Sequence, residues 1–379
     1  MLGVHFYLWT RLVRDTALPL GWRRVLTIAL GTLMFGLASF FLLRRSLPLE
    51  TGRVVLFPIY VWMGMMFLIF VMLLSGDLLR LVFKIATALR NDGPMDSSRR
   101  LFISRTIAGA VTTSAIGLTT LASRSALALS NVVVEKVTVP LQRLPEALDG
   151  FRIVQLSDLH IGPTLDKHWL EGIVARVNAL KPDLVAITGD LVDGSVEELG
   201  GEVAALAQLK APHGVYFCTG NHEYYSGVGD WCTHLPKLGV RVLRNERVSI
   251  ERGSATFDLA GVDDFNARGM ALGHGPALSR ALEERDTSRE LILLAHQPRQ
   301  IFEAAKAGVG LQLSGHTHGG QIWPWHYLVR LQQPYVAGLI DHEGTQLYIS
   351  QGTGFWGPPL RLGTRAEITE ITLRSGPKK

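Results

Sequence analysis

The sequence contains very little cysteine. Only Cys218 and Cys232 occur among its 379 residues. Two cysteines cannot build a disulfide framework, and they are too few for a cysteine-rich zinc site. One disulfide could join them in an oxidising compartment, but two free thiols are the simpler expectation.

Charged residues are also scarce, and they are unevenly placed. Asp, Glu, Lys and Arg make up 19% of the chain and hydrophobic residues 47%, which argues against a disordered or wholly cytosolic protein. Residues 1–130 hold 14 Lys and Arg but only 5 Asp and Glu, whereas the remaining residues hold 24 basic and 28 acidic side chains. The larger part therefore lacks the basic excess that a nucleic-acid groove needs, and we expect no specific nucleic-acid partner.

Two long runs near the N-terminus contain no charged residue. They cover residues 25–43 and 54–74, and arginines stand beside both. About 20 apolar residues in a helix cross the roughly 30 Å hydrocarbon core of a bilayer, so we expect two membrane spans. Residues 1–20 contain internal charges and are expected to form an interfacial helix or a shortened extra span.

A third, milder apolar stretch covers residues 106–129. It follows Arg99 and Arg100, and the sequence SRRLFIS resembles a twin-arginine export signal, although it is internal and Arg124 interrupts the apolar stretch. An ordinary third span is the alternative, and in either case we expect the segment to be retained rather than cleaved. Residues 1–24 and 77–105 are basic and are expected on the cytoplasmic side of the inner membrane. The chain after residue 130 would then lie outside the cytoplasm.

From residue 151 onward, short apolar strands alternate with amphipathic helices and then dominate, which predicts a layered α/β fold. Helices are expected over residues 166–180 and 196–209. Strands are expected at 153–156, 184–187, 215–217, 240–243, 256–262, 291–295, 311–313, 347–349 and 368–373. The predicted organisation is a membrane region over 1–130, a linker over 131–150 and an enzyme domain over 151–379.

Five of the predicted strands are followed by side chains that can bind metals. These side chains are Asp158 and His160, Asp190, Asn221, His296, and His316 and His318. Carboxylate and amide oxygens together with imidazole nitrogens suit Mn, Fe, Zn or Mg. Ligands gather at the carboxyl ends of strands in such sheets, so these residues are expected to meet. A single carboxylate such as Asp190 can bridge two ions about 3.5–4 Å apart.

The ordered motifs D-x-H, G-D-x-x-D, G-N-H-E, an isolated His and G-H-x-H resemble those of the calcineurin-like metallophosphoesterase superfamily over roughly residues 150–375. The longer motif sequences QLSDLH, ITGDLVDG, GNHEYY and SGHTHGGQ are similar to those of a bacterial membrane-associated phosphodiesterase branch. That branch is related to UDP-2,3-diacylglucosamine pyrophosphatases. The resemblance implies a four-layer α-β-β-α sandwich and two divalent ions. It assigns Asp158, His160, Asp190 and His318 to one ion. It assigns Asp190, Asn221, His296 and His316 to the other.

The resemblance also gives His222 a catalytic role, in which it contacts the phosphate or protonates the leaving oxygen. The expected function is a membrane-anchored, dinuclear phosphoesterase that cleaves phosphodiester or pyrophosphate bonds with metal-activated hydroxide. Its substrate could be a lipid or a nucleotide-sugar lipid. The alternatives are a phosphomonoesterase or phosphoprotein phosphatase, and a non-catalytic sensor that keeps the fold.

Three features near the motifs have open roles. Asp193 either orients a ligand or caps a helix. The loop of residues 354–359 could line the substrate mouth, and ordinary surface packing is equally compatible with it. For Tyr224 and Tyr225, core packing is the default expectation and stacking on a substrate is the alternative. Trp323, Trp325, Phe355 and Trp356 could touch a lipid or the bilayer surface.

Overall fold

The computed structural model describes residues 1–89 and 96–376, and the chain divides into two compact units. Unit 1 comprises Met1–Arg124 with Gly357–Leu360, and unit 2 comprises Ser125–Trp356 with Arg361–Lys379. Residues 90–95, which belong to the basic segment predicted to face the cytoplasm, lie outside the described residues.

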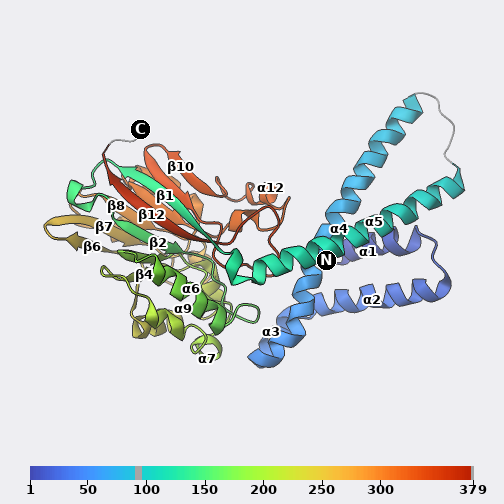
Figure 1. Ribbon diagram of the computed structural model, residues 1–379, viewed down its shortest axis with the longest axis horizontal. Coiled ribbons are helices and arrows are strands. Elements are labelled where there is room, and N and C mark those ends of the chain that lie inside the picture. Colours follow the sequence, from blue (N-terminus) through green and yellow to red (C-terminus); the bar gives the residue numbers. More distant parts are fainter. Residues whose placement is uncertain (90–95, 377–379) are drawn as a thin grey trace. The chain divides into compact units, whose positions relative to one another are not determined.

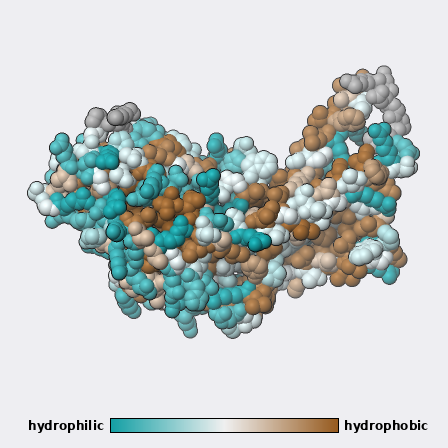
Figure 2. Space-filling view, in the orientation of Figure 1, coloured by the Kyte–Doolittle hydropathy of each residue, from teal (hydrophilic) through white to brown (hydrophobic). Residues whose placement is uncertain are grey.

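Unit 1 is helical, and many of its large apolar side chains are exposed. Three of its helices, at Leu20–Ala38, Leu49–Thr87 and Ser97–Leu127, are long and apolar enough to cross a membrane. Ile28, Phe35 and Leu79 are each about 70% exposed, a surface that lipid accommodates better than water. Figure 2 shows this apolar surface over the helices of unit 1, whereas unit 2 is mostly polar. The helices are α1 (Leu2–Trp9), a π-helical turn (Thr10–Arg14), α2 (Leu20–Ala38), α3 (Phe40–Ser46), α4 (Leu49–Leu89) and α5 (Ser97–Leu127).

The predicted spans correspond to these helices with shifted limits. The span predicted over residues 25–43 is divided between α2 and α3, because the helix is interrupted at Ser39. The second predicted span lies inside α4, and the third lies almost entirely inside α5. The SRRLFIS motif forms part of the first two turns of α5. Within residues 1–20, Leu2–Trp9 form α1 and Thr10–Arg14 form the π-helical turn.

Unit 2 contains two six-stranded sheets (Figure 1). The first has the order β1-β12-β2-β3-β4-β5, and the second has the order β10-β11-β9-β8-β7-β6. The strands of the first sheet are β1 (Val133–Leu141), β2 (Arg152–Leu156), β3 (Leu184–Ile187), β4 (Val215–Phe217), β5 (Val240–Val242) and β12 (Glu367–Ser375). Those of the second are β6 (Glu246–Arg252), β7 (Ala255–Gly261), β8 (Leu291–Leu294), β9 (Leu311–Ser314), β10 (Gly338–His342) and β11 (Thr345–Ile349).

The main hydrophobic core lies between the two sheets. Ile153 and Leu184 of the first sheet and Phe257, Leu259 and Ile292 of the second belong to one fully buried cluster. A second cluster joins the outer face of the second sheet to α10 (Leu278–Ala281) and α11 (Ile301–Lys306). Figure 1 shows α6 (Lys167–Ala179) and α9 (Val228–His234) on the outer side of the first sheet. The predicted α-β-β-α sandwich is therefore confirmed.

Helix α6 shows how sequence determines one of these layers. Its buried side chains recur at helical spacing at Leu170, Ile173, Val174 and Val177. The carboxylate of Asp166 caps its start by accepting a hydrogen bond from the Trp169 N–H at 3.0 Å. The predicted helix over 166–180 is confirmed.

Two segments differ from their predictions. The helix expected over 196–209 is split into α7 (Val196–Leu199) and a 3-10 turn (Ala204–Gln208), because Gly200 and Gly201 disfavour a continuous helix. Within the stretch predicted to be a linker, β1 pairs in parallel with β12 along nine residues, so that part of the chain is a strand of the first sheet. Both cysteines are free thiols.

Candidate metal centre

The predicted site residues sit in loops that follow strands of both sheets. Strands β2, β3 and β4 are parallel neighbours, so their carboxyl ends lie at the same edge of the first sheet. The parallel pair β8 and β9 ends beside them in the second sheet. Backbone hydrogen bonds join the loops, including Asp158 N–H to Gly189 C=O at 3.0 Å and Gly315 N–H to His296 C=O at 2.9 Å. The sandwich thus brings five distant segments together.

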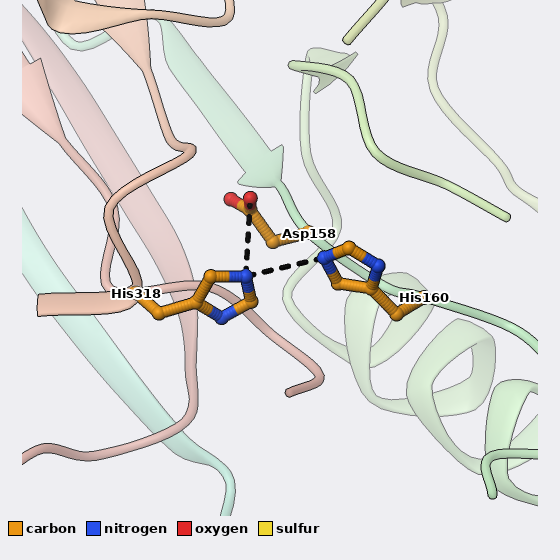
Figure 3. A group of neighbouring side chains, drawn as sticks. All are labelled: Asp158, His160 and His318. Atoms are coloured by element: carbon orange, nitrogen blue, oxygen red, sulfur yellow. Dashed lines mark hydrogen bonds and ion pairs between the residues drawn. The ribbon is translucent and has the colours of Figure 1, made fainter. Parts of the chain in front are cut away.

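A first cluster consists of Asp158, His160 and His318, whose ligand atoms all lie within 4.8 Å of one another. Figure 3 shows the Asp158 carboxylate and the His160 ring both pointing toward the His318 ring. His318 Nε2 lies 3.1 Å from His160 Nε2 and 3.5 Å from Asp158 Oδ1. All three residues are buried.

A second cluster consists of Asp190, His296 and His316. His296 Nε2 lies 3.1 Å from Asp190 Oδ2 and 3.2 Å from His316 Nδ1. His296 Nδ1 lies 2.8 Å from the Thr188 carbonyl, which can only accept a hydrogen bond. This contact places an imidazole proton on Nδ1 and directs Nε2 into the cluster, where burial acts to lower the pKa of His296 but Asp190 outweighs it and raises that pKa well above its ordinary value.

These distances fit a bound cation. Two neutral imidazole nitrogens that both present lone pairs repel each other unless a proton or a cation lies between them. Two ligand atoms at right angles around one ion, each about 2.1 Å from it, stand about 3.0 Å apart. The spacings of 3.1 Å and 3.2 Å between ring nitrogens have this value. Each cluster could therefore hold one divalent metal ion.

The backbone at the site is strained. Asp158, His160, Asp190, His316 and His318 all have positive φ, between 47° and 70°. This left-handed conformation costs a non-glycine residue about 1–3 kcal/mol. It occurs at five of the eight predicted site residues, so the surrounding fold must hold them against this cost.

A third group links the first cluster to His222. Asp193 Oδ1 lies 2.9 Å from His160 Nδ1 and 2.6 Å from His222 Nδ1. The following helix is capped by Ser195, so Asp193 is not a helix cap. Of the two roles predicted for it, the structure supports the orientation of a ligand. The contact leaves His222 Nε2 as the ring nitrogen available to a substrate.

Asn221 begins the short helix α8 (Asn221–Tyr225) and is 7% exposed. Its side-chain oxygen is buried without a hydrogen-bond partner among the described residues. The next residue, His222, donates its backbone N–H to Asp190 Oδ1 at 2.9 Å, which places Asn221 beside the second cluster. An orphaned buried amide oxygen is costly unless it binds a cation or water.

The electrostatics separate the roles of Asp190 and His222. Burial acts to raise the pKa of Asp190, but His296, His222 and His160 outweigh it and hold the pKa well below its ordinary value. For His222, burial acts to lower the pKa, whereas Asp190 and Asp193 raise it to about 9. Asp190 is therefore an ionised carboxylate and His222 a proton carrier at neutral pH.

The neighbouring histidines shift in the opposite direction. Burial, with a contribution from His296, lowers the pKa of His316 to about 3. Burial and His160 hold the pKa of His318 well below its ordinary value. Both imidazoles are consequently neutral, which is the form that binds metals. Burial raises the pKa of Asp158, so a nearby cation would favour its ionised form.

Sequence analysis missed Glu223 and Arg361. The buried carboxylate of Glu223 accepts hydrogen bonds from the N–H groups of Asp190, Leu191 and Gly220 at 2.7–3.0 Å, which ties two site loops together. Its position three residues after Gly220, at the start of a helix, is a capping signal that could have identified it. Arg361 is 6% exposed and donates to backbone carbonyls of the 351–354 loop and to that of His318. No local sequence pattern indicates that Arg361 would bind these backbone carbonyls.

Two exposed aromatic rings stand beside His222. The rings of Tyr225 and Trp356 lie 5.2 Å and 6.2 Å from the His222 ring, and both are more than half exposed. Phe355 is buried, and Tyr224 packs against His274. Of the aromatic residues proposed from the sequence, Tyr225 and Trp356 thus border the site, whereas Phe355 and Tyr224 serve packing.

Comparison with known proteins agrees with these motifs. A family model described as calcineurin-like phosphoesterase matches residues 151–320. A transmembrane protein with metallophosphoesterase domain from Bos taurus is 42% identical over 298 residues, covering 75% of this chain and 66% of the relative. An uncharacterized metallophosphoesterase from Aquifex aeolicus is 35% identical over 243 residues, covering 64% of this chain and 91% of the relative. The match spans slightly less than two thirds of the Bos taurus protein.

Solved structures give weaker likenesses. A 5'-nucleotidase precursor from Thermus thermophilus is 14% identical with a TM-score of 0.38, covering 59% of this chain and 54% of that one. The NAD nucleotidase of Haemophilus influenzae is 17% identical with a TM-score of 0.38, covering 55% and 51%.

The Aquifex relative is matched over nearly its whole length, and the family model covers the segment that carries the motifs. The resemblance noted from the sequence is thus confirmed. The chain belongs to the calcineurin-like metallophosphoesterase family.

Proposed function

We propose that this protein is a dinuclear phosphoesterase, anchored in a membrane, that cleaves phosphodiester or pyrophosphate bonds. The observation that carries the proposal is the position of Asp190 between the two clusters. Its Oδ2 lies 3.1 Å from His296 Nε2 and 3.8 Å from His160 Nε2. One carboxylate within reach of both sets of ligands is the arrangement expected of a bridge between two ions.

The donor set fits two divalent ions. Asp158, His160 and His318 would hold one, Asn221, His296 and His316 the other, and Asp190 both. The orphaned Asn221 oxygen and the neutral imidazoles of His316 and His318 support this assignment. When bound, the ions would activate water for attack on phosphorus and neutralise charge on the phosphoryl oxygens. The mixed oxygen and nitrogen donors are compatible with Mn, Fe, Zn or Mg.

His222 would serve as the proton donor to the leaving oxygen. Asp193 holds its Nδ1 at 2.6 Å, which fixes the ring and stabilises the protonated form. The same Asp193 carboxylate also contacts His160, so it would orient both the proton donor and a metal ligand. His222 is 15% exposed at its side chain, so it is open to a substrate.

The proposed substrate class is a phosphodiester or pyrophosphate with an apolar group, such as a lipid or a nucleotide-sugar lipid. The exposed rings of Tyr225 and Trp356 beside His222 would contact that group. Membrane anchoring, suggested by the three apolar helices and by the name of the Bos taurus relative, would raise encounters with a lipid-linked substrate.

Substrate preference tests the class directly. We expect the manganese-loaded protein to turn over bis-p-nitrophenyl phosphate faster than p-nitrophenyl phosphate, because the proposed site serves diesters. Both rates should be measured in parallel with Mn²⁺, Mg²⁺ and Zn²⁺. A clear preference for the monoester would support the phosphomonoesterase alternative, and no turnover of either would support a sensor.

The bridging role of Asp190 is tested by Asp190→Ala. We expect the loss of both ions, because each coordination sphere loses a charged ligand, and turnover should fall below about 1%. Metal equivalents are measured by elemental analysis. Asp166→Ala, which removes only the cap of α6, is the matched control and should retain both ions. Two equivalents bound to Asp190→Ala would exclude the bridge.

The acid role of His222 is tested by His222→Ala. We expect metal content to be unchanged and turnover to fall about 10²–10⁴-fold on an alkyl phosphodiester, whose leaving group needs a proton. The loss should be much smaller on a p-nitrophenyl ester, whose leaving group is stable as an anion. His168→Ala, at a histidine that is 87% exposed, is the control. Equal losses on both esters would contradict proton donation.

We further propose that α2, α4 and α5 each cross the inner membrane, with the enzyme domain after residue 130 on the extracytoplasmic side. The basic flanks of the spans and the twin-arginine-like motif at the start of α5 support this orientation. A reporter fused after residue 379 tests it. Alkaline phosphatase activity is expected at the C-terminus, and green fluorescence of a cytoplasmic reporter would reverse the orientation.

A further inference from the structure

An exposed apolar segment borders a cavity beside the metal-binding loop. Residues 323–331, here called the aromatic segment, contain α12 (His326–Val329). Five large apolar side chains in these nine residues are between 46% and 80% exposed: Trp323, Trp325, Tyr327, Leu328 and Leu331. A soluble surface seldom gathers so many large apolar side chains within so short a stretch.

The cavity next to this segment has a volume of about 560 Å³. Trp323, His326 and Arg330 form one wall, and Gly363 and Thr364 belong to another. Its floor includes Gly319 and Gly320, which directly follow the candidate metal ligand His318. The volume is of the size that holds a ligand of several tens of atoms.

The described residues that line the cavity include the cation Arg330 and no carboxylate. Neither stretch that supplies the walls contains an acidic residue, since residues 304–340 and 344–366 have no Asp or Glu. Arg330 lines the cavity and is exposed, and His326 adds an imidazole. This environment would attract an anionic group and repel a cationic one.

We propose that the aromatic segment docks on a lipid bilayer and that the cavity receives the anionic headgroup of a phospholipid. Tryptophan and tyrosine favour the boundary between hydrocarbon and water, where one end of the ring is apolar and the other is wet. Arg330 complements the phosphate of a lipid. The chain also carries three helices apolar enough to cross a membrane, so a bilayer is an apolar surface to which this chain would be tethered.

The docking face is continuous with the rim of the metal centre. The side chain of Gln321, two residues before Trp323, accepts the Trp356 N–H at 2.9 Å and donates to the Trp356 carbonyl at 2.8 Å. Trp356 in turn stands beside His222. If the proposed function holds, a lipid-borne phosphoester would reach the site along this face. Docking of the aromatic segment on a bilayer does not require that the metal centre be catalytically active.

Fluorescence quenching in proteoliposomes tests the docking. The full-length chain carries Cys232→Ser, which leaves only the buried Cys218, and Leu331→Cys is labelled with an environment-sensitive probe. Ser254→Cys, in the exposed β6–β7 turn, is the control, and Figure 1 shows that turn and α12 at opposite ends of unit 2. With a shallow doxyl lipid, we expect quenching at 331 to exceed quenching at 254 at least about threefold.

Equal quenching at the two positions would overturn the docking. A probe at 331 that is shielded from both iodide and doxyl lipid would also overturn it, because the segment would then be covered by protein. Turnover of p-nitrophenyl esters, measured on the same samples, reports separately on the proposed function. Inactive samples that still show quenching at 331 would refute the reaction and leave docking supported.

A second comparison in the same experiment tests the proposed headgroup site. Vesicles of phosphatidylcholine are compared with vesicles that also contain phosphatidylglycerol. We expect the anionic lipid to increase quenching at 331, and Arg330→Gln to abolish that increase. Lys237→Gln, at an exposed lysine that does not line the cavity, should leave it unchanged. An increase that survives in Arg330→Gln would refute the headgroup site.

Discussion

The convergence of buried imidazole nitrogens and carboxylates in one small site is the constraint on which this structure depends. Imidazole nitrogens approach one another to 3.1 Å and 3.2 Å in two neighbouring clusters, and an ionised carboxylate stands between them. A divalent cation in each cluster would satisfy such a set of donors. The five left-handed site residues and the unsatisfied Asn221 oxygen belong to this same site and are compatible with cation binding.

The α-β-β-α sandwich meets that requirement by its topology. Parallel strands of one sheet end beside parallel strands of the other, so short loops from distant parts of the chain converge. The core between the sheets, with Phe151 and Phe257 in edge-to-face contact, holds these ends rigidly. Glu223 and Arg361 then lock the loops through backbone hydrogen bonds. The packing of the core offsets the free-energy cost of the strained backbone at the site.

Much of this arrangement could be predicted from the sequence. Strands β3 and β4 have the predicted limits, since their apolar runs are short and bounded by turn residues. All seven candidate metal ligands and His222 lie at the site, because each follows a strand and the strands share an edge. Strand β1 was not predicted, because Glu135, Lys136 and Pro140 interrupt its apolar residues and its pairing with β12 is a long-range contact. The left-handed backbone and the double contact of Asp193 depend on tertiary packing, which local patterns do not encode.

The most direct test is a crystal structure of the manganese-loaded protein with anomalous scattering data. The account predicts two anomalous peaks about 3.5–4 Å apart, one beside Asp158, His160 and His318 and one beside Asn221, His296 and His316, with Asp190 touching both. A single peak, or two peaks that Asp190 does not join, would contradict it.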